Sequence, residues 1–292
     1  MNLKQAIDSA YGLFQREDVP SPRLNAELLM MFVLGCDRAY LFAHPERQLN
    51  GEEQIRYEEV IDERARGCPT QYITGHQEFW GLDLIVSPAV LIPRPETEHV
   101  VETVLDLVRS LDPEQPLNLV DVGTGSGCIA LALATELPTA QMDACDLSED
   151  ALEIARANAA RLGAESRVLF QRSDLLAAYV GRQFDFVVSN PPYVGESEAD
   201  KVQKQVKEFE PKMAVFSGWE GMDIYRRLVP QAYEVLKPGG WLVMEIGFST
   251  EEKVKSLLSG WTSIQTTADL QGIPRVVAAR RGKPTHTLVT GS

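Results

Sequence analysis

Apolar residues recur at helical spacing along the first quarter of the chain. In one stretch they follow each other three to four positions apart, at Leu24, Leu28, Met31 and Leu34. This is the spacing of one face of a helix. Ser21 and Pro22, just before this stretch, have the form of an N-cap followed by proline at the first helical position. The pattern predicts a small helical domain over residues 1–75.

A short segment with alternating apolar residues follows, from Glu78 to Pro93 (EFWGLDLIVSPAVLIP). Alternation is the pattern of a strand rather than of a helix. Gly81 and Pro88 interrupt the segment and are typical of turns between short strands. We therefore expect a β-hairpin linker over residues 76–92.

From residue 93 onward, strand-like and helix-like segments alternate. The strand-like runs are residues 117–122, 141–147, 167–173, 184–190 and 240–247, and helical patterns lie at 128–137, 149–162, 223–236 and after 250. Such alternation builds a parallel sheet with helices on both faces. Two last runs, 263–269 and 275–280, predict an antiparallel hairpin at the sheet's edge. The sequence thus predicts an α/β domain with seven strands over residues 93–283 and a disordered tail over 284–292.

Composition narrows the class of protein. The chain has 292 residues, of which 44% are hydrophobic and 24% charged, as in globular proteins. Its longest strongly apolar run, Leu28 to Cys36, falls well short of the roughly 18 residues that span a bilayer. The start of the chain has no apolar signal core. We expect a cytoplasmic protein without a membrane partner.

The net charge of −14 bears on the substrate. Lys and Arg number 8 against 14 Asp and Glu up to Val90, and 20 against 28 beyond it. Neither part is basic, whereas a nucleic-acid binder neutralises several phosphates with clustered Lys and Arg. The balance argues for a protein or small-molecule substrate.

Cysteine and histidine are dispersed along the chain. They stand at Cys36, Cys68, Cys128 and Cys145, and at His44, His76, His99 and His286. No pair has the close spacing of a zinc site or a redox motif. We expect reduced thiols and no metal.

A glycine-rich loop, Gly123-Thr124-Gly125-Ser126-Gly127, follows the first strand of the α/β region and opens a helix. The glycines let the backbone turn sharply and approach a ligand closely. Cys128 stands where the dinucleotide fingerprint has its third glycine. Asp121 lies at the strand end just before the loop, where a carboxylate suits a cationic amino group better than a pyrophosphate.

The second strand ends in Asp146, 23 positions after Gly123. A carboxylate at this distance hydrogen-bonds the ribose hydroxyls of a nucleoside in such folds. Two plainer interpretations stay open: Asp146 as the cap of the next helix, and Gly125 as the end of a turn. At the end of the third strand, Asp174 can face an adenine amino group while an apolar neighbour covers the ring.

The most specific motif is Asn190-Pro191-Pro192-Tyr193 after the fourth strand. The two prolines fix φ and supply no N–H, so the backbone carbonyls are held rigidly. An NH₂ group placed there can donate to the Asn190 side-chain oxygen and to the Pro191 carbonyl, with the Tyr193 ring on its flat face. The motif predicts methyl transfer to nitrogen by orientation, without a strong base. A simple β-turn after a strand is the alternative.

At this point the chain resembles a known family, the peptide chain release factor N(5)-glutamine methyltransferases, a branch of the class I seven-stranded S-adenosylmethionine-dependent methyltransferases. The resemblance rests on residues 69–84, 91–98, 121–134, 187–194, 209–228, 244–247 and 269–280. It implies a Rossmann-like methyltransferase domain with S-adenosylmethionine as cofactor and S-adenosylhomocysteine as product. The implied substrate is the glutamine of the Gly-Gly-Gln motif in class 1 release factors, which the N-terminal helical domain helps to hold.

The resemblance also implies roles for single residues. Gly123 to Gly127 and Asp146 contact the cofactor, and the position of Leu175 contacts the adenine. Asn190 to Tyr193 hold the substrate glutamine, and Asn190 also touches the cofactor. Arg94 lies in a segment beside the active site whose acids are explained by a helix N-terminus, although Arg94 itself is not. We expect Arg94 to position the cofactor or the substrate loop.

Two other functions compete with this one. A nucleic-acid exocyclic-amine methyltransferase fits NPPY, which such enzymes carry in variants, but not the acidic charge balance. An inactive adaptor is disfavoured because Asp146 and the whole of NPPY are intact. We expect a monomer that acts on release factors and makes no direct contact with nucleic acid.

Overall fold

The computed structural model describes residues 1–111 and 115–282, and the predicted tail over 284–292 lies outside them. The chain divides into two compact units. The first combines residues 1–76 with the later segment 203–209, and the second contains the rest of the described chain. The ranges predicted from the sequence contained no such interruption.

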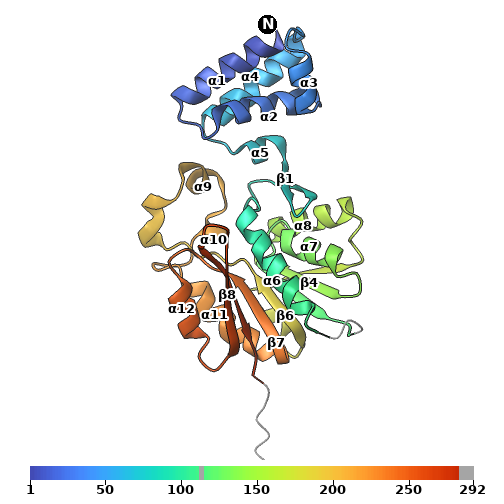
Figure 1. The fold of residues 1–292 in the computed structure, drawn as a ribbon, viewed down its shortest axis with the longest axis vertical. Coiled ribbons are helices and arrows are strands. Elements are labelled where there is room, and N and C mark those ends of the chain that lie inside the picture. Colours follow the sequence, from blue (N-terminus) through green and yellow to red (C-terminus); the bar gives the residue numbers. More distant parts are fainter. Residues whose placement is uncertain (112–114, 283–292) are drawn as a thin grey trace, which may run out of the picture. The chain divides into compact units, whose positions relative to one another are not determined.

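The first unit is helical, as the sequence predicts (Figure 1). Its N-terminal helices are α1 (Leu3–Arg16), α2 (Pro22–Leu34), α3 (Arg38–Ala43), α4 (Gly51–Ala65) and α5 (Thr70–Thr74). Asn2 and Asn50 form capping boxes at the starts of α1 and α4. Ser21 holds the N-cap position of α2, but its backbone is left-handed and its side chain makes no capping hydrogen bond.

Helix α2 buries a different face from the one that its apolar residues suggest. Leu24 and Leu28 are exposed, whereas Ala26, Leu29 and Met30 are fully buried. Because residues 28–34 of this helix are all apolar, spacing alone did not identify the face that meets the core.

Segment 203–209 completes the first unit with helix α9 (Lys204–Phe209). The Arg64 guanidinium donates to the Gln205 side-chain oxygen (3.4 Å). The Phe209 ring packs on Gly67, where an added Cβ would come within 3.3 Å of it. The helical unit is therefore built from two separate parts of the chain.

The second unit contains a seven-stranded sheet in the order β5-β4-β3-β6-β7-β9-β8. The strands are β3 (Asn118–Val122), β4 (Gln141–Asp146), β5 (Val168–Arg172), β6 (Phe184–Ser189), β7 (Leu236–Glu245), β8 (Thr262–Ala268) and β9 (Pro274–Arg280). The first five run parallel, and β9 pairs antiparallel with β7 and β8. The predicted seven strands and edge hairpin are confirmed, with β8 as the edge strand. A separate hairpin, β1 (His76–Phe79) and β2 (Leu82–Ile85), precedes the sheet.

Helices cover both faces of the sheet (Figure 1). One face carries α6 (Glu98–Val108), α7 (Cys128–Glu136) and α8 (Glu149–Arg161), and the other carries α11 (Asp223–Val235) and α12 (Glu251–Leu257). Alternate residues of β7 face the two layers of helices. Trp241 and Val243 belong to the hydrophobic core under α6, α7 and α8, and Leu242 and Met244 belong to the core under α11 and α12. Short elements complete the unit: η1 (Pro95–Thr97), η2 (Ala177–Tyr179), η3 (Glu196–Lys201) and α10 (Lys212–Val215).

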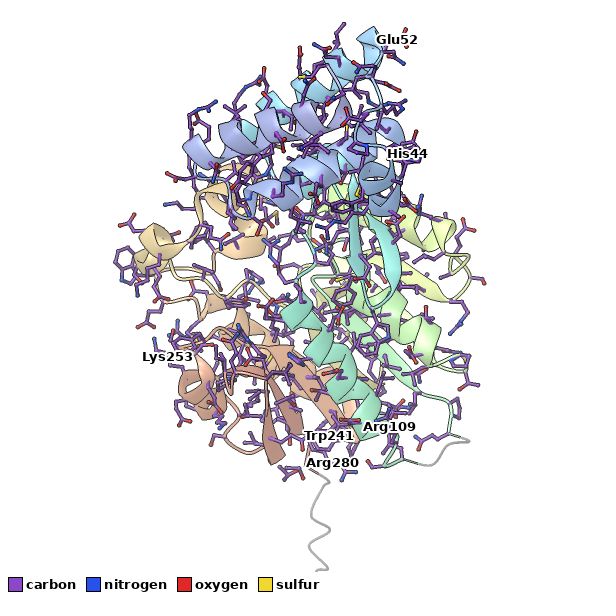
Figure 2. All side chains as sticks on the ribbon, turned by 45° about the horizontal axis from the view of Figure 1, so that its top comes forward. His44, Glu52, Arg109, Trp241, Lys253 and Arg280 are labelled. Atoms are coloured by element: carbon purple, nitrogen blue, oxygen red, sulfur yellow. The ribbon has the colours of Figure 1, made fainter. Side chains whose placement is uncertain are left out.

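The two ends of the sheet differ in chemistry. Figure 2 shows Trp241 and Arg280 together at the end where β7 enters the sheet, and the Arg280 guanidinium lies 5.7 Å from the Trp241 ring centre. The glycine loop, Asp146 and Asn190 all follow the carboxyl ends of β3, β4 and β6. In open parallel sheets, ligands bind at the carboxyl ends of the strands. Within the described ranges no helix is both long and apolar enough to cross a membrane.

Candidate active site

The glycine loop joins β3 to α7. All three glycines have positive φ, at 73° for Gly123, 54° for Gly125 and 83° for Gly127. The backbone N–H groups of Gly123 and Thr124 both donate to the Cys145 carbonyl at the end of β4. A Cβ added to Gly123 or Gly125 would meet nothing within 4 Å. The loop is thus held in a conformation that favours glycine and leaves open space beside it.

Asp121, at the end of β3, is fully buried behind this loop. Its Oδ2 accepts a hydrogen bond from the Thr124 hydroxyl (2.6 Å). Its Oδ1 has no hydrogen-bond partner within the described residues, and neither does the buried Ser126 hydroxyl. Burial raises the pKa of the Asp121 carboxyl to about 7. An unpartnered buried acceptor at this place fits a ligand that brings a hydrogen-bond donor or a positive charge.

Asp146 ends β4 and faces the same loop. Its Oδ2 accepts from the Gly125 N–H (3.0 Å) and its Oδ1 from the Ser148 N–H (2.9 Å). Burial raises the pKa of the Asp146 carboxyl despite these bonds. Ser148, not Asp146, caps α8, because its hydroxyl oxygen accepts from the Ala151 N–H. The helix-capping interpretation of Asp146 is therefore wrong.

Asp174 and Leu175 follow β5. Asp174 forms an ion pair with Arg227 of α11, 2.6 Å between Oδ2 and Nη2, and both side chains are about half exposed. Leu175 has positive φ (52°), and its carbonyl accepts from the Cys145 thiol. Leu175 thus lines the hollow from an unusual backbone conformation.

Asn190 begins a hydrogen-bonded chain that the sequence did not reveal. Its side-chain Nδ2 donates to the Thr97 hydroxyl (3.0 Å), and the Thr97 hydroxyl donates to Glu245 Oε2 (2.6 Å). The Tyr193 hydroxyl donates to the other oxygen, Oε1 (3.1 Å). Thr97 and Glu245 are almost completely buried, and burial raises the pKa of the Glu245 carboxyl to about 7. One carboxylate thus anchors two side chains of the NPPY motif.

The rest of the motif is closely packed. Pro191 is buried, and the Tyr193 ring lies on Gly247, where an added Cβ would come within 2.9 Å of the ring. A Cβ on Gly221 would collide with the Tyr193 carbonyl oxygen at 2.1 Å. NPPY therefore has side-chain contacts well beyond those of a simple β-turn.

These elements enclose one hollow of about 1050 Å³, counting the open solvent at its mouth. The predicted site residues that line it are Gly123, Thr124, Gly125, Ser126, Asp146, Asp174, Leu175, Asn190 and Pro192. Asp121, Gly127, Pro191 and Tyr193 are not among the lining residues. Further lining residues that the sequence did not indicate are Val90, Leu91, Thr97, Met213, Ala214 and Ile224. The hollow thus brings the glycine loop, Asp146 and Asn190 together around one space.

Arg94 is not among the lining residues either. Its guanidinium donates to Glu210, whose other oxygen accepts from the Ile92 N–H (3.1 Å). Glu210 directly precedes Pro211 in sequence, and Pro211 lines the hollow together with the nearby Met213 and Ala214. The structure therefore connects Arg94 to the site through Glu210.

The described side chains also bear on metal binding. No group of three or more His, Cys, Asp or Glu residues in the described ranges could hold a metal ion. The four cysteines are free thiols spread over both units. The chemistry of the hollow comes from carboxylates, amides and backbone groups.

Solved structures share the fold of much of this chain. The hMettl16 catalytic domain in complex with a MAT2A 3′UTR hairpin has a TM-score of 0.57 at 18% identity, over 83% of this chain and 92% of that one. The Thermus thermophilus 16S rRNA methyltransferase RsmC, in complex with AdoMet and guanosine, has a TM-score of 0.51 at 18% identity over 70% of this chain and 49% of its own. Identity this low shows the fold alone.

The fold and the site define a Rossmann-like methyltransferase. Residues 5–75 match the family model of the PrmC N-terminal domain, and residues 103–209 match that of the methyltransferase small domain. The chain belongs to the release factor glutamine methyltransferases, a family of S-adenosylmethionine-dependent enzymes. The family member from Koribacter versatilis is 60% identical over 98% of this chain and 100% of its own length. The one from Moorella thermoacetica is 41% identical over 96% and 99%.

Proposed function

We propose that this enzyme methylates the side-chain amide nitrogen of the glutamine in the Gly-Gly-Gln motif of class 1 peptide chain release factors. The methyl donor in this proposal is S-adenosylmethionine. The observation that carries it is the shared hollow, in which Asn190 of NPPY lies together with Asp146 and the glycine loop. A nitrogen bound at Asn190 would therefore stand beside a cofactor bound at the loop. The names of the relatives, which cover this chain almost completely, supply the substrate.

The residues present fit the cofactor. The open space against Gly123 suits the amino-acid end of the cofactor. Asp121, which lies behind the glycine loop and not on the wall of the hollow, would act on the ammonium group through its charge. Asp146 is placed at the end of β4, where a carboxylate receives ribose hydroxyls. Asp174 and Leu175 would hold the adenine. When bound, S-adenosylmethionine supplies a methyl group on a positively charged sulfur.

The protein's own contribution is orientation. In the proposed reaction, the glutamine NH₂ donates one hydrogen to the Asn190 side-chain oxygen and the other to the Pro191 carbonyl, while the Tyr193 ring covers its flat face. Two oriented acceptors polarise a weakly nucleophilic amide nitrogen. Holding the reactants in place can lower the barrier by roughly 7–11 kcal/mol. The nitrogen loses one proton to solvent when it gains the methyl group, so no strong base is needed.

The helical unit and the charge balance suit a protein substrate. Residues 1–75 contain none of the proposed site residues, and we assign them to holding the release factor. The net charge of −14 disfavours a nucleic-acid substrate. In this proposal the enzyme works as a monomer in the cytoplasm, on factors of translation termination.

Mass spectrometry tests the proposal. Purified enzyme and S-adenosylmethionine are incubated with a class 1 release factor, and the Gly-Gly-Gln peptide is then analysed. We expect the mass of one CH₂ to be added on the glutamine. Stripped ribosomal RNA and DNA serve as competing substrates in parallel reactions. Methyl transfer to either of these, with an unmodified release factor, would contradict the proposal.

A further inference from the structure

The orientation of the Asn190 amide follows from the chemistry of the groups behind it. An amide side chain has a donor end and an acceptor end, and a structure without hydrogens does not distinguish them by itself. A threonine hydroxyl has a single hydrogen. The Thr97 hydroxyl donates this hydrogen to Glu245, so toward Asn190 the Thr97 oxygen can act only as an acceptor. The end of Asn190 that faces Thr97 must then be its NH₂ group.

Glu245 determines which group donates and which accepts in the hydrogen bonds from Asn190 through Thr97 to Glu245. An ionised carboxylate accepts hydrogen bonds and donates none. Its two oxygens receive the Thr97 and Tyr193 hydroxyls, and its backbone carbonyl receives the Tyr225 hydroxyl (2.8 Å). The Thr97 and Tyr193 hydroxyls are therefore both donors to this carboxylate.

We propose that Thr97 and Glu245 are positioning residues for methyl transfer, which hold the Asn190 amide with its oxygen turned away from Thr97 to receive the substrate NH₂. The inference rests on the proposed function, since it concerns how that site selects a hydrogen-donating nitrogen. A reversed amide would present a second NH₂ group to the substrate nitrogen and would repel it. Through Tyr193, the same carboxylate also steadies the ring proposed to cover the substrate.

The protonation state of Glu245 enters this mechanism. A protonated Glu245 can itself donate to Thr97, which leaves the Thr97 hydrogen available for the Asn190 oxygen. Besides the tyrosines, the titratable and charged groups near Glu245 are Glu96, which raises its pKa, Arg275, which lowers it, and the Cys128 thiol, whose own pKa Glu245 raises. Burial raises the pKa of Glu245 to about 7. Turnover at saturating cofactor should therefore increase with pH through this range. Below it, a growing fraction of Asn190 amides is free to reverse.

Matched threonine variants separate positioning from packing. Thr97→Val removes the hydroxyl with little change in shape, Thr97→Ser keeps the hydroxyl, and Thr103→Val is the control. Thr103 is also buried, its hydroxyl hydrogen-bonds the Thr267 hydroxyl (3.0 Å), and it does not line the hollow. We expect Thr97→Val to lower kcat by about 10- to 100-fold, since a misoriented acceptor acts on the transition state. Thr97→Ser and Thr103→Val should stay close to wild type, and calorimetry should show similar S-adenosylmethionine affinity in all four proteins.

Two further measurements complete the test. In the wild type, the side-chain NH₂ resonances of Asn190 should be sharp and slowly exchanging, and in Thr97→Val they should broaden. In Glu245→Gln, the increase of kcat with pH should disappear. Equal kcat for Thr97→Val and Thr103→Val, or unchanged Asn190 resonances, would overturn the inference. The proposed function is judged separately, by whether the wild type methylates the release factor, and the resonance measurement does not depend on it.

Discussion

Arg94 donates a hydrogen bond to Glu210 across 116 positions of sequence, and the Glu210 side chain is fully buried. The same carboxylate accepts from the Ile92 N–H. The pair therefore joins the segment after the β1–β2 hairpin to the segment that opens with Pro211. Both segments line the hollow, at Val90 and Leu91 on one side and at Met213 on the other.

Breaking this pair should loosen both segments. In Arg94→Gln, the buried Glu210 carboxylate loses its charged partner, and we expect unfolding to become easier by about 1–3 kcal/mol. Urea denaturation measures this change, and steady-state kinetics measures the accompanying loss of kcat/KM. The double variant Arg94→Gln with Glu210→Gln should recover much of both, because two neutral amides can hydrogen-bond. If stability returns but kcat/KM does not, Arg94 contacts the substrate directly.

Asp146→Ala should weaken S-adenosylmethionine binding by roughly 10- to 100-fold, because hydrogen bonds to a charged group contribute about 1.5–3 kcal/mol. The variant also removes the acceptor of the hydrogen bond that the Gly125 N–H donates to Asp146. Isothermal calorimetry gives the affinity. Asp150→Ala, an exposed acid in the first turn of α8, is the control and should bind normally. Equal affinities for the two variants would refute the ribose assignment.

Asn190→Ala should lower turnover by at least ~10²-fold, as when one oriented polar group is removed from the transition state. Cofactor affinity should change much less, because Asp121 and Asp146 remain. Thermal melting would show whether the variant stays folded. Turnover near the wild-type value would show that the NPPY motif does not orient the substrate nitrogen.

Cofactor affinity should depend on pH through Asp121. Burial raises the pKa of the Asp121 carboxyl to about 7, and a bound ammonium group would favour its ionised form. The favourable interaction of ionised Asp121 with the cofactor is therefore fully present above about pH 7 and is lost as the pH falls below this value. Cofactor affinity should fall by up to about tenfold per pH unit in that range. Titrations of S-adenosylmethionine between pH 5.5 and 7 check the slope. Asp121→Asn should bind more weakly and with a flatter pH profile, and a slope unchanged in this variant would exclude Asp121 as its source.

The sequence predicted the strands and the glycine loop because both signals are local. Alternating runs and glycines with positive φ leave their marks within a few positions. Thr97, Glu210 and Glu245 were missed because the hydrogen bonds that connect them to the site join residues far apart in sequence. The separations are 93 positions between Asn190 and Thr97, 116 between Arg94 and Glu210, and 148 between Thr97 and Glu245. A signal for Glu245 did exist: it is a lone acid in the apolar run WLVMEIG, and a buried charged residue nearly always has partners.

Helix α2 and segment 203–209 show another limit. Leu24 and Leu28 had helical spacing but are exposed, since an apolar helix offers more than one face to the core. Segment 203–209 (QKQVKEF) is short and polar, and its place in the helical unit depends on contacts with Arg64 and Gly67. Periodicity carries no information about such distant contacts.

The helical unit consists of two separate pieces of chain, and this limits how domains can be exchanged between these enzymes. Because segment 203–209 belongs with residues 1–76, the boundary between the units cuts the chain three times rather than once. A chimera that exchanges only the N-terminal helices between two relatives would place a foreign Phe209 against the new counterpart of Gly67. Replacing both pieces together preserves that packing. Under the proposed role of the helical unit in holding the release factor, substrate preference should follow the two pieces jointly, and their residues should covary among relatives.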